Sequence, residues 1–240
     1  MRFDGRSPRE LRPTTIELSP IEYAEGSALI HMGKTQVLCA VSVEERVPQW
    51  LQGRGKGWLT AEYALLPRAT HTRTPRSHIQ GGRAQEIRRL IGRSLRRAVR
   101  LDMIGEIMLI VDCDVIQADG GTRTAAINGG YVAIALALER LIRAGTVPPA
   151  SLLPPIGAVS VGVVSGEPLV DLAYAEDANA EMDLNVVADA QGNFVEVQGT
   201  AEGSPIPRET LDTLLDIASA GIQTLIGIQR EVLACTGIAV

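Results

Sequence analysis

The sequence predicts an α+β fold. Runs of branched apolar residues bounded by turn signals are followed by stretches with helical spacing, and this order of strands and then helix occurs twice. A proline-rich stretch at 147–155 separates the two occurrences. The 240 residues are 45% hydrophobic, which is enough to bury a core without disulfides or a metal. We therefore expect a single domain spanning 1–240, with two pseudo-repeated halves at about 1–146 and 156–240 that share one core.

The first half is predicted to begin with an antiparallel meander of strands at 14–18, 28–32 and 36–43. Residues 83–100 then place apolar side chains at a spacing near 3.6 with arginines between them, which predicts an amphipathic helix with a basic face. A long strand at 106–117, a turn at 119–121 and a second helix at 122–143 complete this half.

The second half repeats this order of elements. Strands are expected at 157–164, 167–173, 181–188 and 194–198. Glycine-containing turns at 165–166 and 191–193 connect two pairs of these strands. An apolar stripe from residue 211 to residue 233 then predicts a C-terminal helix.

The formal net charge of −5, taken alone, argues against a protein that binds nucleic acid. The charges are segregated, however, because residues 46–100 carry a net charge of +11 and the rest of the chain carries −16. All but one of the basic residues in that segment are arginines, whose planar guanidinium matches the geometry of phosphate. Two interpretations stay open: a solvated helix face with ion pairs at a subunit interface, or contact with phosphate or RNA.

The distribution of apolar residues also indicates where in the cell the protein acts. The longest apolar runs are shorter than the ~20 residues of a membrane span, and the first residues lack the apolar core of a signal peptide. We therefore expect a cytoplasmic protein without a membrane partner. Cys39, Cys113 and Cys235 lie far apart in apolar stretches, so all three are expected to be buried free thiols.

The predicted turn between strand and helix reads Asp-Gly-Gly-Thr-Arg-Thr from Asp119. Glycines let the backbone approach a ligand, and the first turn of a helix presents unpaired N–H groups to an anion. The hydroxyl of Thr122 and the guanidinium of Arg123 add a hydrogen-bond donor and a positive charge. The alternative is an ordinary Asp-Gly turn followed by a threonine at the helix start.

An acidic cluster precedes and enters the predicted strand at 181–188. Glu181, Asp183 and Asn185 alternate with apolar residues and therefore share one face, while Asp177 lies in the preceding turn. Two or three oxygen ligands with water would suit Mg²⁺ or Mn²⁺. A solvated acidic hairpin is the alternative.

A polar loop at 67–78 carries Arg68, Arg73 and Arg76 among prolines and threonines. Cations at this spacing can follow a polynucleotide backbone. The aromatic content of 3% argues against base stacking as the main source of affinity. His71 and His78 have no nucleophile partner or metal-ligand spacing, so their expected role extends no further than contact with RNA.

Blocks over almost the whole chain carry a family resemblance: 4–6, 37–39, 57–63, 66–68, 70–73, 85–87, 89–93, 112–124 and 196–203. Together they resemble the bacterial ribonuclease PH family of phosphate-dependent 3′-to-5′ exoribonucleases. The resemblance implies an RNase PH-like fold, of the type seen in domain 2 of ribosomal protein S5. It also implies an enzyme, a nucleotidyltransferase in which inorganic phosphate attacks the last phosphodiester and a nucleoside diphosphate leaves.

The same resemblance implies roles for individual residues. Phosphate would bind at Arg83, Gly121, Thr122 and Arg123. Asp177 and Asp183 would be catalytic and would hold Mg²⁺ or Mn²⁺, with Asp183 as a general acid in the alternative mechanism. Related polynucleotide phosphorylase domains have a lysine where this chain has Asn185. Arg68, Arg73 and Arg76 would bind RNA.

The implied partners are transfer RNA precursors with 3′ extensions, ribosomal RNA and inorganic phosphate, but not DNA. Members of the family assemble as homohexamers, built as trimers of dimers. A catalytically silent RNA-binding subunit of an exosome-like ring is the competing hypothesis. Both the arginine and the aspartate clusters are present, which favours the active enzyme.

Overall fold

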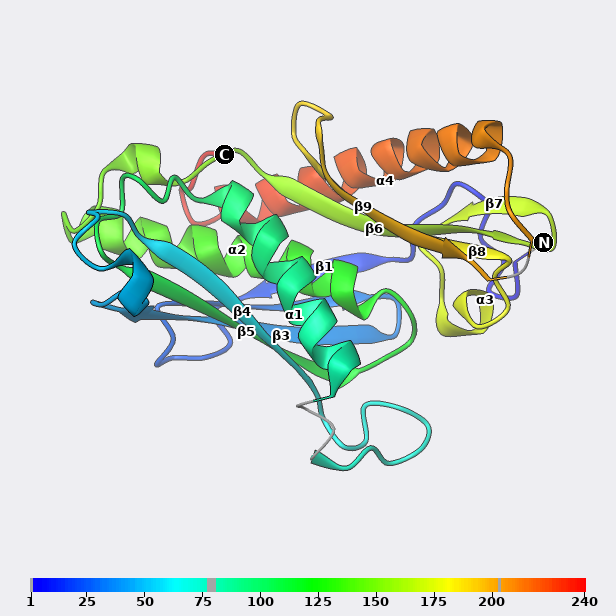
Figure 1. Cartoon of the computed structure of the whole chain (residues 1–240), viewed down its shortest axis with the longest axis horizontal. Helices are drawn as coiled ribbons and strands as arrows, with labels where there is room; N and C mark the ends of the chain where they lie inside the picture. Colours follow the sequence, from blue (N-terminus) through cyan, green and yellow to red (C-terminus); the bar gives the residue numbers. More distant parts are fainter. Residues whose placement is uncertain (1, 77–80, 203) are drawn as a thin grey trace.

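The computed structural model describes residues 2–76, 81–202 and 204–240, which form two β-sheets and three long helices (Figure 1). The first sheet contains, in spatial order, β1 (Thr14–Leu18), β2 (Gly26–Met32), β3 (Thr35–Glu44), β5 (Met108–Gln117) and β4 (Trp58–Leu65). Neighbouring strands are antiparallel except β4 and β5, which are parallel. The meander expected at the start of the chain is therefore present as β1, β2 and β3.

The second sheet is antiparallel throughout. Its spatial order is β7 (Glu167–Val170), β6 (Ile156–Val164), β8 (Met182–Asp189) and β9 (Phe194–Ala201). A four-residue helix, α3 (Tyr174–Asp177), lies between β7 and β8 in the chain. Asp177 therefore ends a short helix, and Asp183 follows it on the central strand β8.

The long helices connect the two sheets. Helix α2 (Thr122–Arg143) packs on β2 and β3 of the first sheet and also on β6 of the second. Helix α1 (Gly82–Leu95) packs on β4 and α2, while α4 (Arg208–Ala234) packs on β6, β7 and β8 (Figure 1). Short 3₁₀ helices occur at Gln49–Leu51, Arg96–Ala98 and Pro149–Ser151. The mixture of grouped strands and helices is the α+β class that the sequence predicts.

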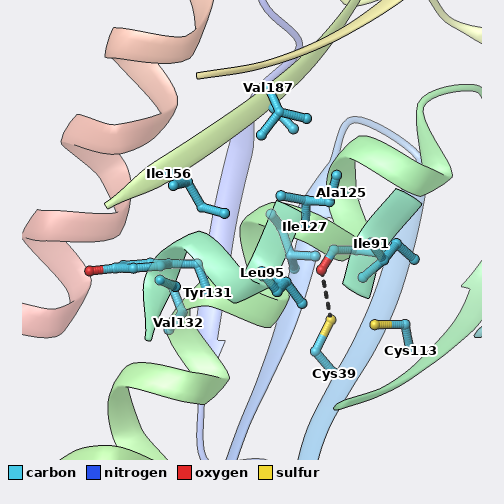
Figure 2. Close-up of a cluster of buried hydrophobic side chains, with 14 of the residues drawn as sticks. Cys39, Ile91, Leu95, Cys113, Ala125, Ile127, Tyr131, Val132, Ile156 and Val187 are labelled. Carbon is cyan, nitrogen blue, oxygen red and sulfur yellow. Dashed lines mark hydrogen bonds between the residues drawn. The ribbon is translucent and has the colours of Figure 1, made fainter. Parts of the chain in front are cut away.

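The hydrophobic core is continuous across both sheets and all three long helices. Figure 2 shows the part around α2, where Ile127 and Tyr131 belong to the same cluster as Ile91 of α1 and Ile156 of β6. These four residues are fully buried. Because α2 is enclosed by apolar side chains along most of its length, its first turn is held rigidly relative to both sheets.

One buried asparagine joins α2 to the second sheet. The Asn128 side chain donates to the carbonyl of Ala158 at 2.8 Å and accepts from the N–H of the same residue at 3.1 Å. Strand β7 pairs only with residues 161–164 of β6, so Asn128 satisfies backbone groups beyond the point where β7 ends. Gln229 of α4 donates to both Asn128 Oδ1 and the carbonyl of Ile156, at 3.0 Å each.

Several boundaries differ from those expected. The helix predicted at 83–100 ends at Leu95, and Val99 is already extended in a bridge with Leu152. The strand predicted at 167–173 ends at Val170, because Asp171 has a φ of 53°, which interrupts extended backbone. Strand β4 and helix α3 were not predicted.

The cysteine prediction was wrong at one of its three positions. Cys39 and Cys113 are buried free thiols, as expected, and face each other in the register of β3 and β5. Cys235 is exposed just beyond the end of α4.

Two helices of the described chain, α2 and α4, are long and apolar enough to cross a membrane if length and composition alone are considered. The apolar window of α2 is 72% buried within the protein, and that of α4 is 39% buried. Core helices of soluble proteins commonly pass the same test.

Candidate active site

A cleft of about 740 Å³ lies where the two sheets meet α1, α2 and α3. Its walls include the first turn of α2, the beginning of α1 and polar positions of β8 and β9. The predicted phosphate-binding residues and both predicted catalytic aspartates line it: Arg83, Gly121, Thr122, Arg123, Asp177 and Asp183. Residues from three distant parts of the sequence thus open into one space.

Two glycines give the turn before α2 its shape. Gly120 and Gly121 have φ values of 76° and 63°, in the left-handed region that glycine adopts without strain. A Cβ atom on Gly120 would lie 2.5 Å from the carbonyl oxygen of Leu172 and 2.8 Å from the nitrogen of Tyr174. The turn therefore touches the segment that leads into α3, and this close approach requires glycine. It brings Thr122 and Asp177 to the same cleft.

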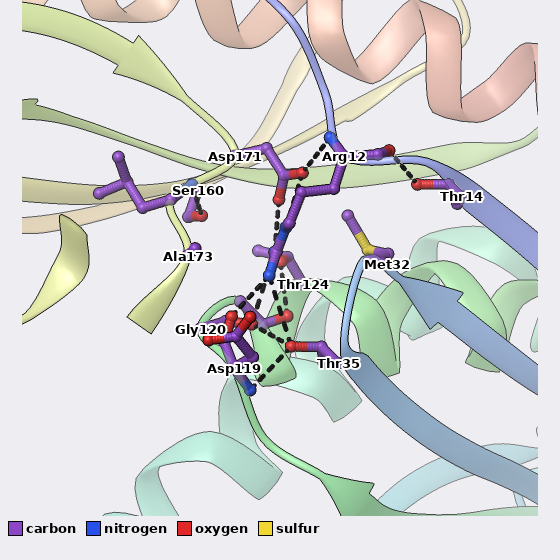
Figure 3. A network of polar contacts seen from close by, with 12 residues as sticks. Arg12, Thr14, Met32, Thr35, Asp119, Gly120, Thr124, Ser160, Asp171 and Ala173 are labelled. Atoms are coloured by element: carbon purple, nitrogen blue, oxygen red, sulfur yellow. Dashed lines mark hydrogen bonds and ion pairs between the residues drawn. The ribbon is translucent and has the colours of Figure 1, made fainter. Parts of the chain in front are cut away.

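Arg12 holds this turn from inside the protein (Figure 3). Its guanidinium donates to the carbonyl oxygen of Asp119 at 2.5 Å and forms an ion pair with Asp171 at 2.6 Å. Thr35 also contributes, because its hydroxyl donates to the Gly120 carbonyl at 2.7 Å and accepts from the Asp119 N–H at 3.0 Å. Arg12 and Asp171 are 4% and 0% exposed, so a paired buried charge fixes the position of the turn.

The first turn of α2 presents its groups to the cleft. Gly121 is the N-cap of the helix, so the N–H groups that follow lack helical partners and can bind an anion. Thr122 Oγ1 lies 2.8 Å from the hydroxyl of Tyr63 on β4. Arg123 forms a 3.5 Å ion pair with Glu86 of α1, and Gln198 of β9 donates to the same carboxylate at 3.1 Å.

Asp183 lies close enough to Asp177 to affect the ionisation of that residue. The pKa of Asp177 is raised, first because the walls of the cleft desolvate it and second because of the negative charge of Asp183. The positive charges of Arg123, Arg83 and Arg12 oppose this rise. The residue keeps an open surface, so water or a small ligand can reach the carboxylate even though protein atoms surround it. Arginine and aspartate clusters therefore belong to one electrostatic site.

The N-terminal segment supports the helix that carries Asp177. Arg2 donates to both carboxylate oxygens of Glu176, at 2.7 and 2.6 Å, and Glu176 accepts from the N–H of Ala173 at 3.0 Å. Arg6 contacts the same carboxylate at 3.5 Å. Arg2, Arg6 and Glu176 are all buried. A helix of only four residues is thus stabilised by buried ion pairs.

The acidic face predicted on β8 is divided between two places. Asp183 and Asn185 line the cleft, and Asn185 is 8% exposed. Glu181 precedes the strand, accepts from the N–H of Gly166 at 2.9 Å and borders a neighbouring groove. No group of three or more His, Cys, Asp or Glu residues forms a metal cage within the described ranges. Two carboxylates that open into a cleft lined by arginines nevertheless fit Mg²⁺, which keeps water and substrate oxygens as ligands.

The arginine loop, defined here as residues 67–76, leaves the cleft at Thr70. Its base is fixed, since Ala118 donates to the Ala69 carbonyl at 2.8 Å and Ala69 is buried. Arg68, Arg73 and Arg76 are exposed, and none of them forms an ion pair with the residues that the structure describes. His71 lies beside Tyr174, with ring centroids 6.3 Å apart, whereas His78 lies outside the described residues.

Sequence reasoning missed several residues of the site. Glu86 and Tyr63 were noted only within the blocks of resemblance, and Arg12 was not singled out. Neither Glu86 in an arginine-faced helix nor Tyr63 in an unpredicted strand carries a local signal. Their positions depend on contacts with residues 37 and 59 positions away in the sequence.

Comparisons with known proteins identify the family of the chain. Residues 10–138 and 155–221 match the models for domains 1 and 2 of the 3′ exoribonuclease family. Ribonuclease PH of Moorella thermoacetica is 55% identical over 236 residues, which cover 97% of this chain and 94% of that protein.

Solved structures of more distant proteins have the same fold. Rrp46 of rice (Oryza sativa) superposes with a TM-score of 0.78 at 21% identity, covering 97% of this chain and all of that one. A chain of the Archaeoglobus fulgidus exosome, solved with RNA bound to the active site, gives a TM-score of 0.77 at 26% identity, covering 93% and 91%. Two family models together span most of the sequence, and a homologue more than half identical covers nearly all of it. The chain belongs to the 3′ exoribonuclease family, and its fold is that of ribonuclease PH.

Proposed function

We propose that this protein shortens RNA from the 3′ end by phosphorolysis within the cleft. It is an exoribonuclease that uses phosphate rather than water, and each cycle releases one nucleoside diphosphate. The observation that carries the assignment of the site is that an anion-binding helix start and a pair of aspartates open into the same cavity. Such a cavity can bring two phosphate groups together and stabilise the charge that they share.

In the proposed mechanism, inorganic phosphate binds at the first turn of α2. The guanidinium groups of Arg83 and Arg123 neutralise its charge, and the Thr122 hydroxyl and the free N–H groups orient it. One of its oxygens then attacks the phosphorus of the last phosphodiester. The bond from that phosphorus to the 3′-oxygen of the shortened chain breaks, so the attacking phosphate becomes the β-phosphate of the released diphosphate.

Asp177 and Asp183 lie on the opposite side of the reacting group in this proposal. Their carboxylates would hold Mg²⁺ or Mn²⁺, which supplies electrostatic stabilisation of the transferring phosphate. Asp183 can alternatively give a proton to the departing 3′-oxygen. A ligand role predicts that Asp183→Asn regains activity as Mg²⁺ is increased, and an acid role predicts that it does not.

Transfer RNA precursors with 3′ extensions are the proposed substrate, with ribosomal RNA as a second. The exposed arginine loop supports binding of a structured RNA outside the cleft. We further propose that the protein acts in the cytoplasm as a homohexamer, a trimer of dimers. The exposed basic face of α1 and the exposed edge of β9 support an interface between copies.

A 3′-extended transfer RNA incubated with the protein and Mg²⁺, with and without phosphate, tests the reaction. We expect nucleoside diphosphates only when phosphate is present, and identification of the mononucleotide by chromatography checks this. Monophosphates formed in phosphate-free buffer would show hydrolysis and overturn the proposal. RNA binding without any released nucleotide would instead identify a silent ring subunit.

A further inference from the structure

Tyr63 is a nearly buried residue at the wall of the cleft. It belongs to β4, is 2% exposed, and lines the cavity beside the phosphate turn. Thr122 Oγ1, at 2.8 Å, is the one hydrogen-bond partner of its hydroxyl within the part of the chain that the structure describes. Tyr63 thus contacts the proposed phosphate site through a single hydrogen bond between two hydroxyl groups.

Burial determines which of the two hydroxyls donates. If Thr122 donated, the proton of the Tyr63 hydroxyl would be buried without an acceptor, which is unfavourable. If Tyr63 donates, its own proton is satisfied, and Thr122 keeps a proton for a ligand in the cleft. Desolvation also raises the pKa of Tyr63, against the Thr122 contact and the charges of Arg83 and Arg123, so the phenol retains its proton.

We propose that Tyr63 is a positioning residue, whose hydroxyl donates to Thr122 Oγ1 and thereby directs the Thr122 proton toward an oxygen of the bound phosphate. This inference rests on the proposed function, in which Thr122 contacts phosphate. Tyr63 itself does not touch the ligand. Its donation leaves the Thr122 proton free for the ligand, which suits an anion with acceptor oxygens.

Tyr63→Phe removes the hydroxyl and keeps the ring that fills the core. We expect the KM for phosphate to rise roughly three- to tenfold, the effect of one neutral hydrogen bond, with kcat unchanged. The KM for RNA should stay unchanged. In the reverse reaction, the KM for a nucleoside diphosphate should rise by the same factor, because its β-phosphate occupies the phosphate position.

Tyr131→Phe is the matched control. Tyr131 is also a buried tyrosine, but its hydroxyl donates to the carbonyl of Leu153 at 3.2 Å, away from the cleft. This variant should leave both KM values unchanged. If Tyr63→Phe raises the KM for RNA as much as the KM for phosphate, or if Tyr131→Phe gives the same kinetic change, Tyr63 acts through packing and the inference is wrong.

Thr122→Val and the double variant complete a mutant cycle. If Tyr63 acts through Thr122, adding Tyr63→Phe to Thr122→Val should change the KM for phosphate no further. Additive effects would overturn the inference. If Thr122→Val raises the KM for phosphate and Tyr63→Phe does not, the role of Tyr63 is rejected, but the proposed phosphate site is not. An unchanged KM in Thr122→Val rejects the proposed phosphate site as well.

Discussion

Asp177 is a carboxyl group whose proposed function opposes its contribution to stability. Desolvation in the cleft and the nearby charge of Asp183 raise its pKa above the ordinary value of 3.8. The folded protein therefore holds this proton more tightly than the unfolded chain does. As pH rises from the unfolded pKa through the folded one, ionisation of Asp177 lowers the stability of the fold. At neutral pH the protein retains a charge that its own structure disfavours, as expected for a cation-binding or catalytic group.

Asp177→Asn should therefore abolish most activity while raising the free energy of unfolding at pH 7 in the absence of divalent cations. The gain should shrink as pH falls below the raised pKa, because wild-type Asp177 is then also neutral. Urea unfolding between pH 3.5 and pH 7.5, with EDTA and with Mg²⁺, measures this, and Mg²⁺ should stabilise the wild type more than the variant.

Asp189→Asn provides the control of opposite sign. Desolvation of Asp189 opposes ionisation, but hydrogen bonds from Asn193 and Gln191 dominate and lower its pKa. Removing this charge should destabilise the fold at neutral pH and leave catalysis unchanged. If Asp177→Asn is active at ordinary Mg²⁺ and no more stable than wild type, the cluster is a solvated hairpin.

At the scale of elements, the position of α2 depends on a polar contact within the core. Asn128 satisfies both backbone groups of Ala158 where no neighbouring strand reaches them, and it accepts from Gln229 of α4. Helix α2, strand β6 and helix α4 are therefore joined at this side chain. Its loss would leave several buried polar groups without partners, each at a cost of about 1–3 kcal/mol.

Asn128→Ala should therefore lower the free energy of unfolding by roughly 3–5 kcal/mol. Asn179→Ala is the matched control, because Asn179 is exposed and water can replace its 2.8 Å bond to the Ala175 carbonyl. That change should stay within about 0.5 kcal/mol of wild type. Equal effects of the two substitutions in urea titrations would contradict the structural role of Asn128.

The sequence predicted best those elements whose signal is local. The helix predicted at 122–143 has the observed bounds of α2, because its apolar spacing and the preceding glycines both mark its start. Strand β4 was missed because three of the five residues at its centre, Thr-Ala-Glu-Tyr-Ala, are alanine or glutamate, which have weak strand preference, and pairing with β5 makes it extended. Helix α3 has four residues, too few to show a helical period.

The distinction between local signals and long-range contacts also applies to the cleft. The turn at Gly120 and the alternating polar residues of β8 could be recognised from neighbouring residues. Their meeting in one cavity could not, because it depends on the contact of Gly120 with Leu172 and on the buried pair of Arg12 and Asp171. The roles of Glu86 and Tyr63 follow only from these long-range contacts.

Across the whole molecule, the basic segment divides into two parts. Along α1, arginines are partly neutralised, as in the pairs of Arg88 with Glu62 and Arg93 with Glu196. In the arginine loop the charges are exposed and form no ion pair among the described residues. The loop therefore concentrates positive potential beside the cleft, although the chain is acidic overall.

Arg68→Ala, Arg73→Ala and Arg76→Ala should therefore weaken RNA binding without altering the chemistry. Each lost phosphate contact should reduce the slope of log affinity against log salt by roughly 0.7–0.9. The KM for a 3′-extended transfer RNA should rise much more than that for a short oligonucleotide that does not reach the loop, with kcat preserved on both. Arg143→Ala removes the same charge at the far end of α2, about 32 Å from Thr122, and should leave both KM values and the salt slope unchanged. Equal losses on long and short substrates, with an unchanged salt slope, would assign the loop arginines to folding or subunit assembly, and size-exclusion chromatography of the triple variant would separate those two causes.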